Sequence, residues 1–409
     1  MIRLRHDPMR LSRQEKTHRF LCSSIVFLVF GIDLMASFPN GPVSLIKSIA
    51  LGLIFISGFY TIFSINGKVC TSAIFKLIYL YLFLLTVRLF YDFVLLQTPF
   101  FMYHNISSLF IIFSGTIVLP AVIFGTQRFT IDFDKLILCL KILSITILLL
   151  SVRDIFTGKM IALNGGRFEG HGVLDTIYLG HQGTTLILLT LHKFKNRLWF
   201  NIPCLIVGLL SLSCSGSRGP TLALLICISI YSLFNVQSNR IRALVILIAI
   251  VIAFTYKDII SFGVSYFDSI GIRSFDRIAA FLIGQDINGG RENIYESGIE
   301  YFFENPILGK SYLLPDLSYV HNIFIEQFMA LGFVGGAIFF FIMLYTLIVG
   351  FKNWRDKGLK NVSVFFIIFI QYIIFGCFSR TIIALPQLWI CTFLILHYDE
   401  FRYIRQVSE

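Results

Sequence analysis

Charged residues are scarce in this sequence. Asp, Glu, Lys and Arg make up only 14% of the 409 residues, whereas hydrophobic residues make up 56% and phenylalanine alone occurs 44 times. The mean hydropathy is +0.80. A water-soluble domain of this length could not bury so much apolar surface. The composition therefore excludes an ordinary soluble protein and indicates an integral membrane protein.

Signatures of several common function classes are also missing. The eight cysteines include no CxxC pair, which argues against a disulfide framework and against a zinc site. There is no Walker motif and no Ser-His-Asp arrangement, and the glycine-rich stretch 164–171 does not follow a strand, as a nucleotide fingerprint would. The net charge is +11, and the basic residues lie between the apolar runs, where they indicate membrane topology. We therefore expect no metal site and no nucleic-acid partner.

Twelve apolar runs are long enough to cross a bilayer, which takes roughly 17 to 25 residues per helix. Six basic residues precede the first run and no small-residue cleavage site follows it, so we expect no cleavable signal peptide. The predicted fold is an all-α polytopic membrane protein with about twelve transmembrane helices and one large outer loop. The predicted spans are 20–38, 45–66, 73–95, 105–125, 134–152, 175–192, 197–214, 219–236, 240–257, 323–350, 362–379 and 382–398.

The positions of Lys and Arg predict the orientation, because short cytoplasmic loops are enriched in them. Residues 1–19 and 399–409 are then cytoplasmic, the transmembrane helices occupy 20–257 and 323–398, and the large loop at 258–322 is periplasmic. Some basic residues remain on the outside, where topology does not explain them. We expect them to serve anions, and the alternative is pairing with nearby carboxylates or lipid phosphates. They are Arg153, Lys159, Arg167, Arg218, Arg273, Arg277, Arg291, Lys310 and Arg380.

The stretch 289–336 is the most informative part, because a hydrophobic chain turns polar there. Apolar residues within it follow a helical spacing, and Pro306 with Gly309 ends the run. We expect an amphipathic helix against the outer membrane surface. Arg291, at the start of this helix, is well placed to meet an anion, while the acidic residues form a solvated face. The apolar positions are Ile294, Tyr295, Ile299 and Phe302.

The stretch SGSRGP at 215–220 lies at the outer end of the seventh predicted span. Its glycines and proline break the helix, and the next helix is expected to begin at Pro220. The N-terminal end of that helix and the Arg218 guanidinium would together form a seat for a diphosphate. The alternative is a tight turn with a snorkelling arginine.

His321 and Asn322 stand where the polar loop meets the tenth predicted span. Imidazole suits proton transfer near neutral pH, and a purely structural histidine is the alternative. Glu326 follows about one helical turn after Asn322, and the glycines of 332–336 permit a re-entrant bend or close helix packing. Within the third span, Arg88 and Asp92 are either functional or simply neutralise one another.

In this order, the three constellations resemble the O-antigen ligase/polymerase family of polytopic membrane glycosyltransferases. The matching stretches are SGSRGPTLALL, GGRENIYESGIEYFFENPILGKSY and HNIFIEQFMALGFVGG, within 213–336. The resemblance implies a transferase at the periplasmic face of the bacterial inner membrane, with undecaprenyl-diphosphate-linked saccharide as donor and no cofactor or essential metal. It places diphosphate-binding arginines at Arg218 and Arg291 and the family histidine at His321.

Within this family we predict an O-antigen polymerase, which joins lipid-linked oligosaccharide repeat units. The alternative is the ligase, which transfers glycan to lipid A-core and often carries a denser histidine signature before the Asn. Here the chain reads Ser-Tyr-Val-His-Asn, and Gly336 replaces the Thr expected after G-x-x-G. A second alternative is a lipid-linked oligosaccharide flippase or other transporter, which the gathering of polar residues on one face disfavours.

The predicted site follows from this function. The catalytic set comprises two arginines that stabilise the leaving diphosphate and a histidine that orients or deprotonates the acceptor, with one carboxylate as a second candidate base. These residues are Arg218, Arg291, His321 and Glu326; Arg167, Arg380, Asn322 and Tyr319 complete the substrate-binding set. The expected partners are the lipid-linked donor and acceptor, membrane lipids and a chain-length regulator.

Overall fold

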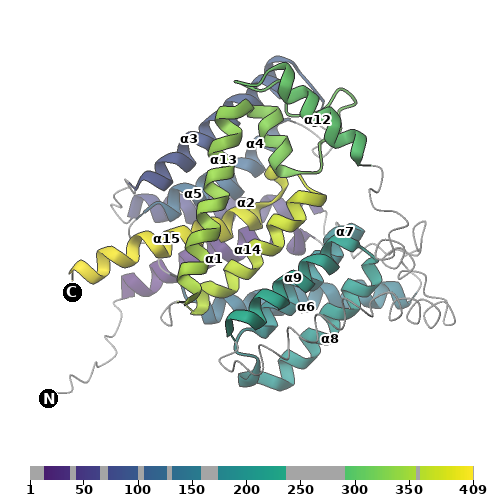
Figure 1. Ribbon diagram of the computed structural model, residues 1–409. Helices are drawn as coiled ribbons and strands as arrows, with labels where there is room; N and C mark the ends of the chain where they lie inside the picture. The colour runs from purple at the N-terminus through teal and green to yellow at the C-terminus, as the bar shows by residue number, and fades with distance from the viewer. Residues whose placement is uncertain are drawn as a thin grey trace.

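The computed structural model describes residues 13–36, 43–64, 72–99, 106–126, 131–157, 174–235, 291–355 and 360–408. All the secondary-structure elements among these residues are helices, which confirms the all-α class (Figure 1). The longer helices are α1 (Arg13–Ala36), α2 (Val43–Ser64), α3 (Ala73–Phe90), α6 (Phe133–Phe156), α7 (Thr176–Leu191), α8 (Leu198–Ser215), α9 (Arg218–Asn235), α12 (Glu292–Glu304), α13 (Ile323–Arg355), α14 (Lys360–Phe378) and α15 (Pro386–Ser408). Shorter pieces are η1 (Tyr91–Leu95), α4 (Ile106–Phe113), η2 (Ser114–Val118), α5 (Leu119–Phe124), η3 (Phe194–Arg197) and η5 (Ile382–Ala384).

Each predicted span coincides with a helix or a run of helices, except 240–257, which lies outside the described residues. Five helical segments are long and apolar enough to cross a membrane: Ala73–Leu95, Ile106–Phe124, Phe133–Ile155, Phe194–Ser215 and Ile323–Arg355. Shorter apolar helices occur at Ser48–Phe63, Arg218–Ser232 and Val362–Phe378. The count of twelve spans and the periplasmic side of the large loop therefore stay predictions.

Helix α7 forms the most enclosed part of the bundle. It packs against α8, α9, α6 and α14, and nearly all of its side chains are buried. Several of them are polar, and they bond within the bundle: Gln182 donates to the Tyr372 hydroxyl at 3.3 Å and Gln371 donates to the Thr185 hydroxyl at 2.9 Å. Such pairs satisfy groups that would be costly to bury alone.

Helix α13 is broken at Gly332, where the backbone turns to φ 65° and ψ −164°. The break frees backbone groups that the chain after α12 then satisfies. Phe333 N–H donates to the Pro306 carbonyl at 2.6 Å, and Lys310 N–H donates to the Met329 carbonyl at 2.9 Å. Of the two alternatives for the glycines, a bend or close helix packing, the structure shows a bend at Gly332. It docks residues 306–310 into the break, which fixes the path of the following polar segment.

Helix α12 confirms the predicted amphipathic helix and ends at Glu304, just before Pro306. It lies at one end of the bundle against α13 (Figure 1). Its closest approach is at Gly298, where an added Cβ would press on Val320 and Ile325. Gly298 is buried in this contact, whereas Ile299, which the sequence assigns to the apolar face, is 44% exposed. Contact of α12 with the outer membrane surface stays a prediction.

We predict that a side chain at position 332 destabilises the protein. A Cβ there would overlap the Ile307 carbonyl and would require a left-handed backbone. Since an unfavourable backbone conformation alone costs about 1–3 kcal/mol, Gly332→Ala should lower the melting temperature of the purified protein in detergent. Gly52→Ala in α2 is the matched control, because nothing lies within 4 Å of its added Cβ. Equal melting temperatures for the two variants would contradict the role given to Gly332.

Candidate functional site

The site is built around the end of helix α14. The last carbonyl groups of a helix have no partner within it, and here they accept bonds from side chains of other elements. The Tyr295 hydroxyl donates to the Cys377 carbonyl at 3.4 Å, the Arg291 guanidinium donates to the Phe378 carbonyl, and the Tyr319 hydroxyl donates to the Ser379 carbonyl at 3.1 Å. We call residues 377–381 the α14 turn. It joins α12 and the segment 305–322, which we call the polar loop, to the last two helices.

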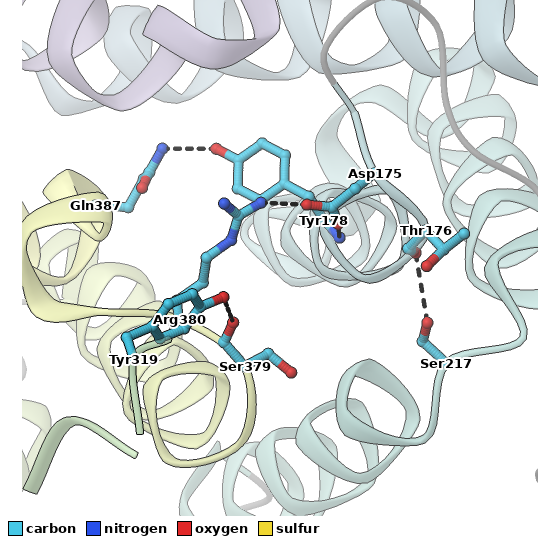
Figure 2. Close-up of polar contacts among 8 residues, drawn as sticks. All are labelled: Asp175, Thr176, Tyr178, Ser217, Tyr319, Ser379, Arg380 and Gln387. Atoms are coloured by element: carbon cyan, nitrogen blue, oxygen red, sulfur yellow. Dashed lines mark hydrogen bonds and ion pairs between the residues drawn. The ribbon is translucent and has the colours of Figure 1, made fainter. Parts of the chain in front are cut away.

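Arg380 projects from the α14 turn towards the first turn of α7. Its guanidinium lies 2.5 Å from Asp175 and over the ring of Tyr178, at 5.3 Å from the ring centre (Figure 2). It also lies 5.7 Å from the ring centre of Phe375. Gln387 donates to the Tyr178 hydroxyl at 2.8 Å and holds that ring from the other end. Asp175 also caps α7 by accepting from Tyr178 N–H at 2.8 Å. The arginine is therefore fixed in position by an ion pair and two aromatic rings.

His321 lies near Arg291 and Arg380 and has a left-handed backbone conformation with φ 58°. Its ring is 4.1 Å from that of Tyr319. Burial and the positive charges of Arg291 and Arg380 lower the pKa of His321 to about 4, although a hydrogen bond with the Ser379 backbone acts in the opposite direction. The imidazole is therefore neutral at pH 7. Its Nδ1 finds no partner among the described residues.

The other predicted residues of this segment have different surroundings. Asn322 caps α13, because its side-chain oxygen accepts from the backbone N–H of Phe324 at 3.0 Å and of Ile325 at 3.2 Å. Glu326 is fully buried, and one of its oxygens accepts from the Tyr312 hydroxyl at 2.9 Å and from Ile382 N–H at 3.1 Å. Asn322 therefore fixes the start of α13, and Glu326 holds Tyr312 next to the residue that follows the α14 turn.

Arg218 begins helix α9, two residues earlier than the sequence predicts. Helix α8 ends at Ser215, and Gly216 takes the left-handed conformation that terminates a helix. The Ser217 hydroxyl then donates to the Thr176 carbonyl at 3.4 Å, which ties the start of α9 to the start of α7 (Figure 2). The start of α9 and the Arg380 side chain therefore both lie at the N-terminal turn of α7. Arg167 lies outside the described residues.

Sequence reasoning did not identify Asp175, Tyr178 and Gln387. An Asp before an apolar run is a usual helix cap, so Asp175 could have been identified as the start of α7. Its pairing with Arg380 joins residues 205 positions apart. No local pattern reports such a contact.

The arrangement is suited to binding an anion. It brings the guanidinium groups of Arg291 and Arg380 to the α14 turn, beside the N-terminal turn of α7, and the positive end of that helix favours negative charge. The phenol of Tyr319 stays protonated at neutral pH, because burial raises its pKa, and the neutral imidazole adds a group able to accept a proton. Among the described residues, no group of three or more His, Cys, Asp or Glu could hold a metal ion.

One comparison with known proteins bears on this site. Residues 203–340 match the family described as O-Antigen ligase. The matched part includes Arg218, Arg291 and His321, whereas Asp175 and Arg380 lie outside it on either side. It supports a ligase- or polymerase-like glycosyltransferase activity on lipid-linked glycan. No curated protein matches the chain.

The surroundings of His321 predict its titration. Histidine NMR in detergent should report a pKa near 4 for this ring, well below the ordinary value of about 6.5. Arg291→Ala should raise this pKa, because one of the two repelling charges is lost, whereas Lys135→Ala on the exposed surface of α6 should leave it unchanged. Since the folded pKa is lowered, stability should fall as the pH drops from about 6.5 towards 4. A value near 6.5 would contradict the described burial.

Proposed function

We propose that this chain, whose residues 203–340 match the family described as O-Antigen ligase, is an O-antigen polymerase. The growing glycan on undecaprenyl diphosphate is the donor, and a new lipid-linked repeat unit is the acceptor. A sugar hydroxyl of the acceptor attacks the anomeric carbon of the donor. The bond from that carbon to the diphosphate oxygen breaks, undecaprenyl diphosphate leaves, and the hydroxyl proton passes to a base.

The convergence of Arg291 and Arg380 at the α14 turn is the observation that carries this proposal. Breaking the glycosidic bond leaves negative charge on the diphosphate, and fixed positive groups stabilise that charge most when they need not reorganise. Asp175 and the ring of Tyr178 already hold the Arg380 guanidinium. Arg218 at the start of α9 is the third cation of this proposed seat.

His321 is the proposed base for the acceptor hydroxyl. It is neutral at pH 7 and so can accept a proton, although a pKa near 4 makes it a weak base in the free protein. A bound diphosphate would offset the charges of Arg291 and Arg380, which lower this pKa. The basicity of His321 would therefore rise once the donor is bound. Glu326, the second candidate base, lies fully buried, which favours a positioning role.

The ligase remains a second candidate, because the matched family is described as O-Antigen ligase. Both reactions release undecaprenyl diphosphate, so the same arginines would serve either one. They differ in the acceptor, which is another lipid-linked repeat for the polymerase and lipid A-core for the ligase. A flippase would need no cluster of fixed arginines beside a histidine. We place the reaction at the periplasmic face of the inner membrane and include a chain-length regulator as a proposed partner.

The lipopolysaccharide ladder of cells lacking this gene tests the proposal. Core carrying a single repeat, restored to a ladder by the wild-type chain, identifies a polymerase. Bare core with polymer accumulating on the lipid carrier identifies the ligase instead. An unchanged ladder would contradict both and would favour a transporter.

Complementation with site variants tests the arginines. Arg291→Ala and Arg380→Ala should each lower the rate of polymer formation by roughly 10²–10³-fold, since each removes a charge that stabilises the leaving group. Arg153→Ala is the control, because Arg153 pairs with the adjacent Asp154 at the end of α6. Comparable membrane levels of all variants must be shown by immunoblot. Full activity of both site variants would remove the basis for a diphosphate seat.

The pH dependence of the reaction tests the role of His321. At low pH, kcat/KM should decrease as the His321 of the free protein becomes protonated, with a pKa near 4. The decrease in kcat reports the donor complex, and we expect its pKa to be higher. His321→Gln should remove both decreases along with most of the activity. Identical pKa values for kcat and kcat/KM would argue against a diphosphate bound next to this imidazole.

A further inference from the structure

A cavity opens beside residues 311–317, and none of Arg218, Arg291 and Arg380 lines it. Its volume is about 180 Å³, and it lies between the end of the third span and residues 311–317. Its polar lining comes from Asp92, Thr98, Tyr301 and Ser311, and its apolar lining includes Phe93 and Leu313. Pockets for drug-sized ligands measure roughly 300–1,000 Å³. This cavity is therefore suited to a single small ring.

Asp92 lines the cavity and carries one carboxylate oxygen that has no hydrogen-bond partner among the described residues. It lies in η1, a π-helical turn, and such turns are frequent at functional sites. One carboxylate oxygen accepts from Tyr312 N–H at 2.7 Å and from Arg88 at 3.1 Å. The other oxygen has no partner among the described residues, and neither has Nη2 of Arg88, although Asp92 is only 2% exposed. A buried acceptor without a donor is costly, which indicates that a ligand supplies one.

The cavity and the arginine site are linked by one segment. Tyr312 donates its backbone N–H to Asp92 and its hydroxyl to Glu326, next to the α14 turn. The segment then continues to Tyr319 and His321. A ligand that reaches both places would have a diphosphate at one end and a hydroxyl-rich group at the other. A lipid-linked glycan has this chemistry.

We propose that this cavity binds one sugar ring of the lipid-linked glycan. Hydroxyl groups of the ring would donate to Asp92 and exchange bonds with Thr98, Tyr301 and Ser311, while its C–H groups pack on Phe93 and Leu313. This mixture of a few polar groups with apolar walls orients a ligand as well as burying it. The inference rests on the proposed function. It adds that the chain recognises the glycan itself, at a place separate from the diphosphate.

Thiol protection tests this site without using activity. Ser311→Cys is introduced into the full-length protein in lipid nanodiscs, and its labelling by a maleimide is followed by mass spectrometry. The probe is the repeat-unit oligosaccharide released from the lipid carrier of cells lacking this gene, and maltotetraose is the control sugar. We expect the oligosaccharide to slow labelling of Cys at 311, and to leave Asn305→Cys unaffected, because Asn305 lies outside the cavity.

Matched variants then assign the binding to the cavity. Tyr301→Ala in the Ser311→Cys background should raise the oligosaccharide concentration for half-protection by roughly tenfold, the equivalent of about 1.4 kcal/mol. Phe303→Ala should not change it, since that ring lies on the same helix but is 70% exposed and outside the lining. Tyr301→Phe separates loss of the hydroxyl from loss of the ring.

Several outcomes would overturn the inference. No protection by the oligosaccharide, or equal protection by maltotetraose, would mean that the cavity does not recognise this glycan. Protection by nanodisc lipids alone would make it a lipid site. These results are separate from the ladder in the null strain. A normal role in polymer formation with an unprotected Cys at 311 would remove only the sugar site, whereas an unchanged ladder would remove the proposed function itself.

Discussion

The carbonyl groups at the end of helix α14 have no partner within that helix, and the contacts that satisfy them hold the candidate site together. A helix end that is not exposed to water needs donors from elsewhere. Here Tyr295, Arg291 and Tyr319 supply them from α12 and the polar loop. The same turn carries Arg380. Satisfying one helix end therefore brings two arginines and, through Tyr319, the ring of His321 into one place.

The break in α13 is the second constraint. Gly332 interrupts the helix, and residues 306–310 occupy the gap by bonding to Met329 and Phe333. The segment 311–321 then passes Asp92, which accepts from Tyr312 N–H, and reaches the α14 turn, where the Tyr319 hydroxyl donates to the Ser379 carbonyl. A continuous helix would have no free backbone groups for this purpose. The bend thus determines where the cavity and the histidine lie relative to one another along the segment.

Charge compensation explains how several cations coexist here. Arg380 is paired with Asp175, Arg291 bonds to a carbonyl, and His321 stays neutral. The free protein thus lowers the cost of gathering positive charge in a partly buried place. A diphosphate would add the negative charge that this arrangement accommodates. The electrostatics of the free site and the proposed reaction therefore favour the same ligand.

The sequence by itself determined the features that depend on neighbours along the chain. The lengths of the apolar runs located the long helices that the structure describes, and helical spacing located the loop helix, which ends just before Pro306. The motifs around Arg218, Arg291 and His321 lie within the part that matches the family. Only the tertiary structure decided which of these residues meet. Asp175 pairs with Arg380 across 205 positions and Tyr312 with Asp92 across 220. Such contacts depend on how whole helices pack, which local spacing does not encode.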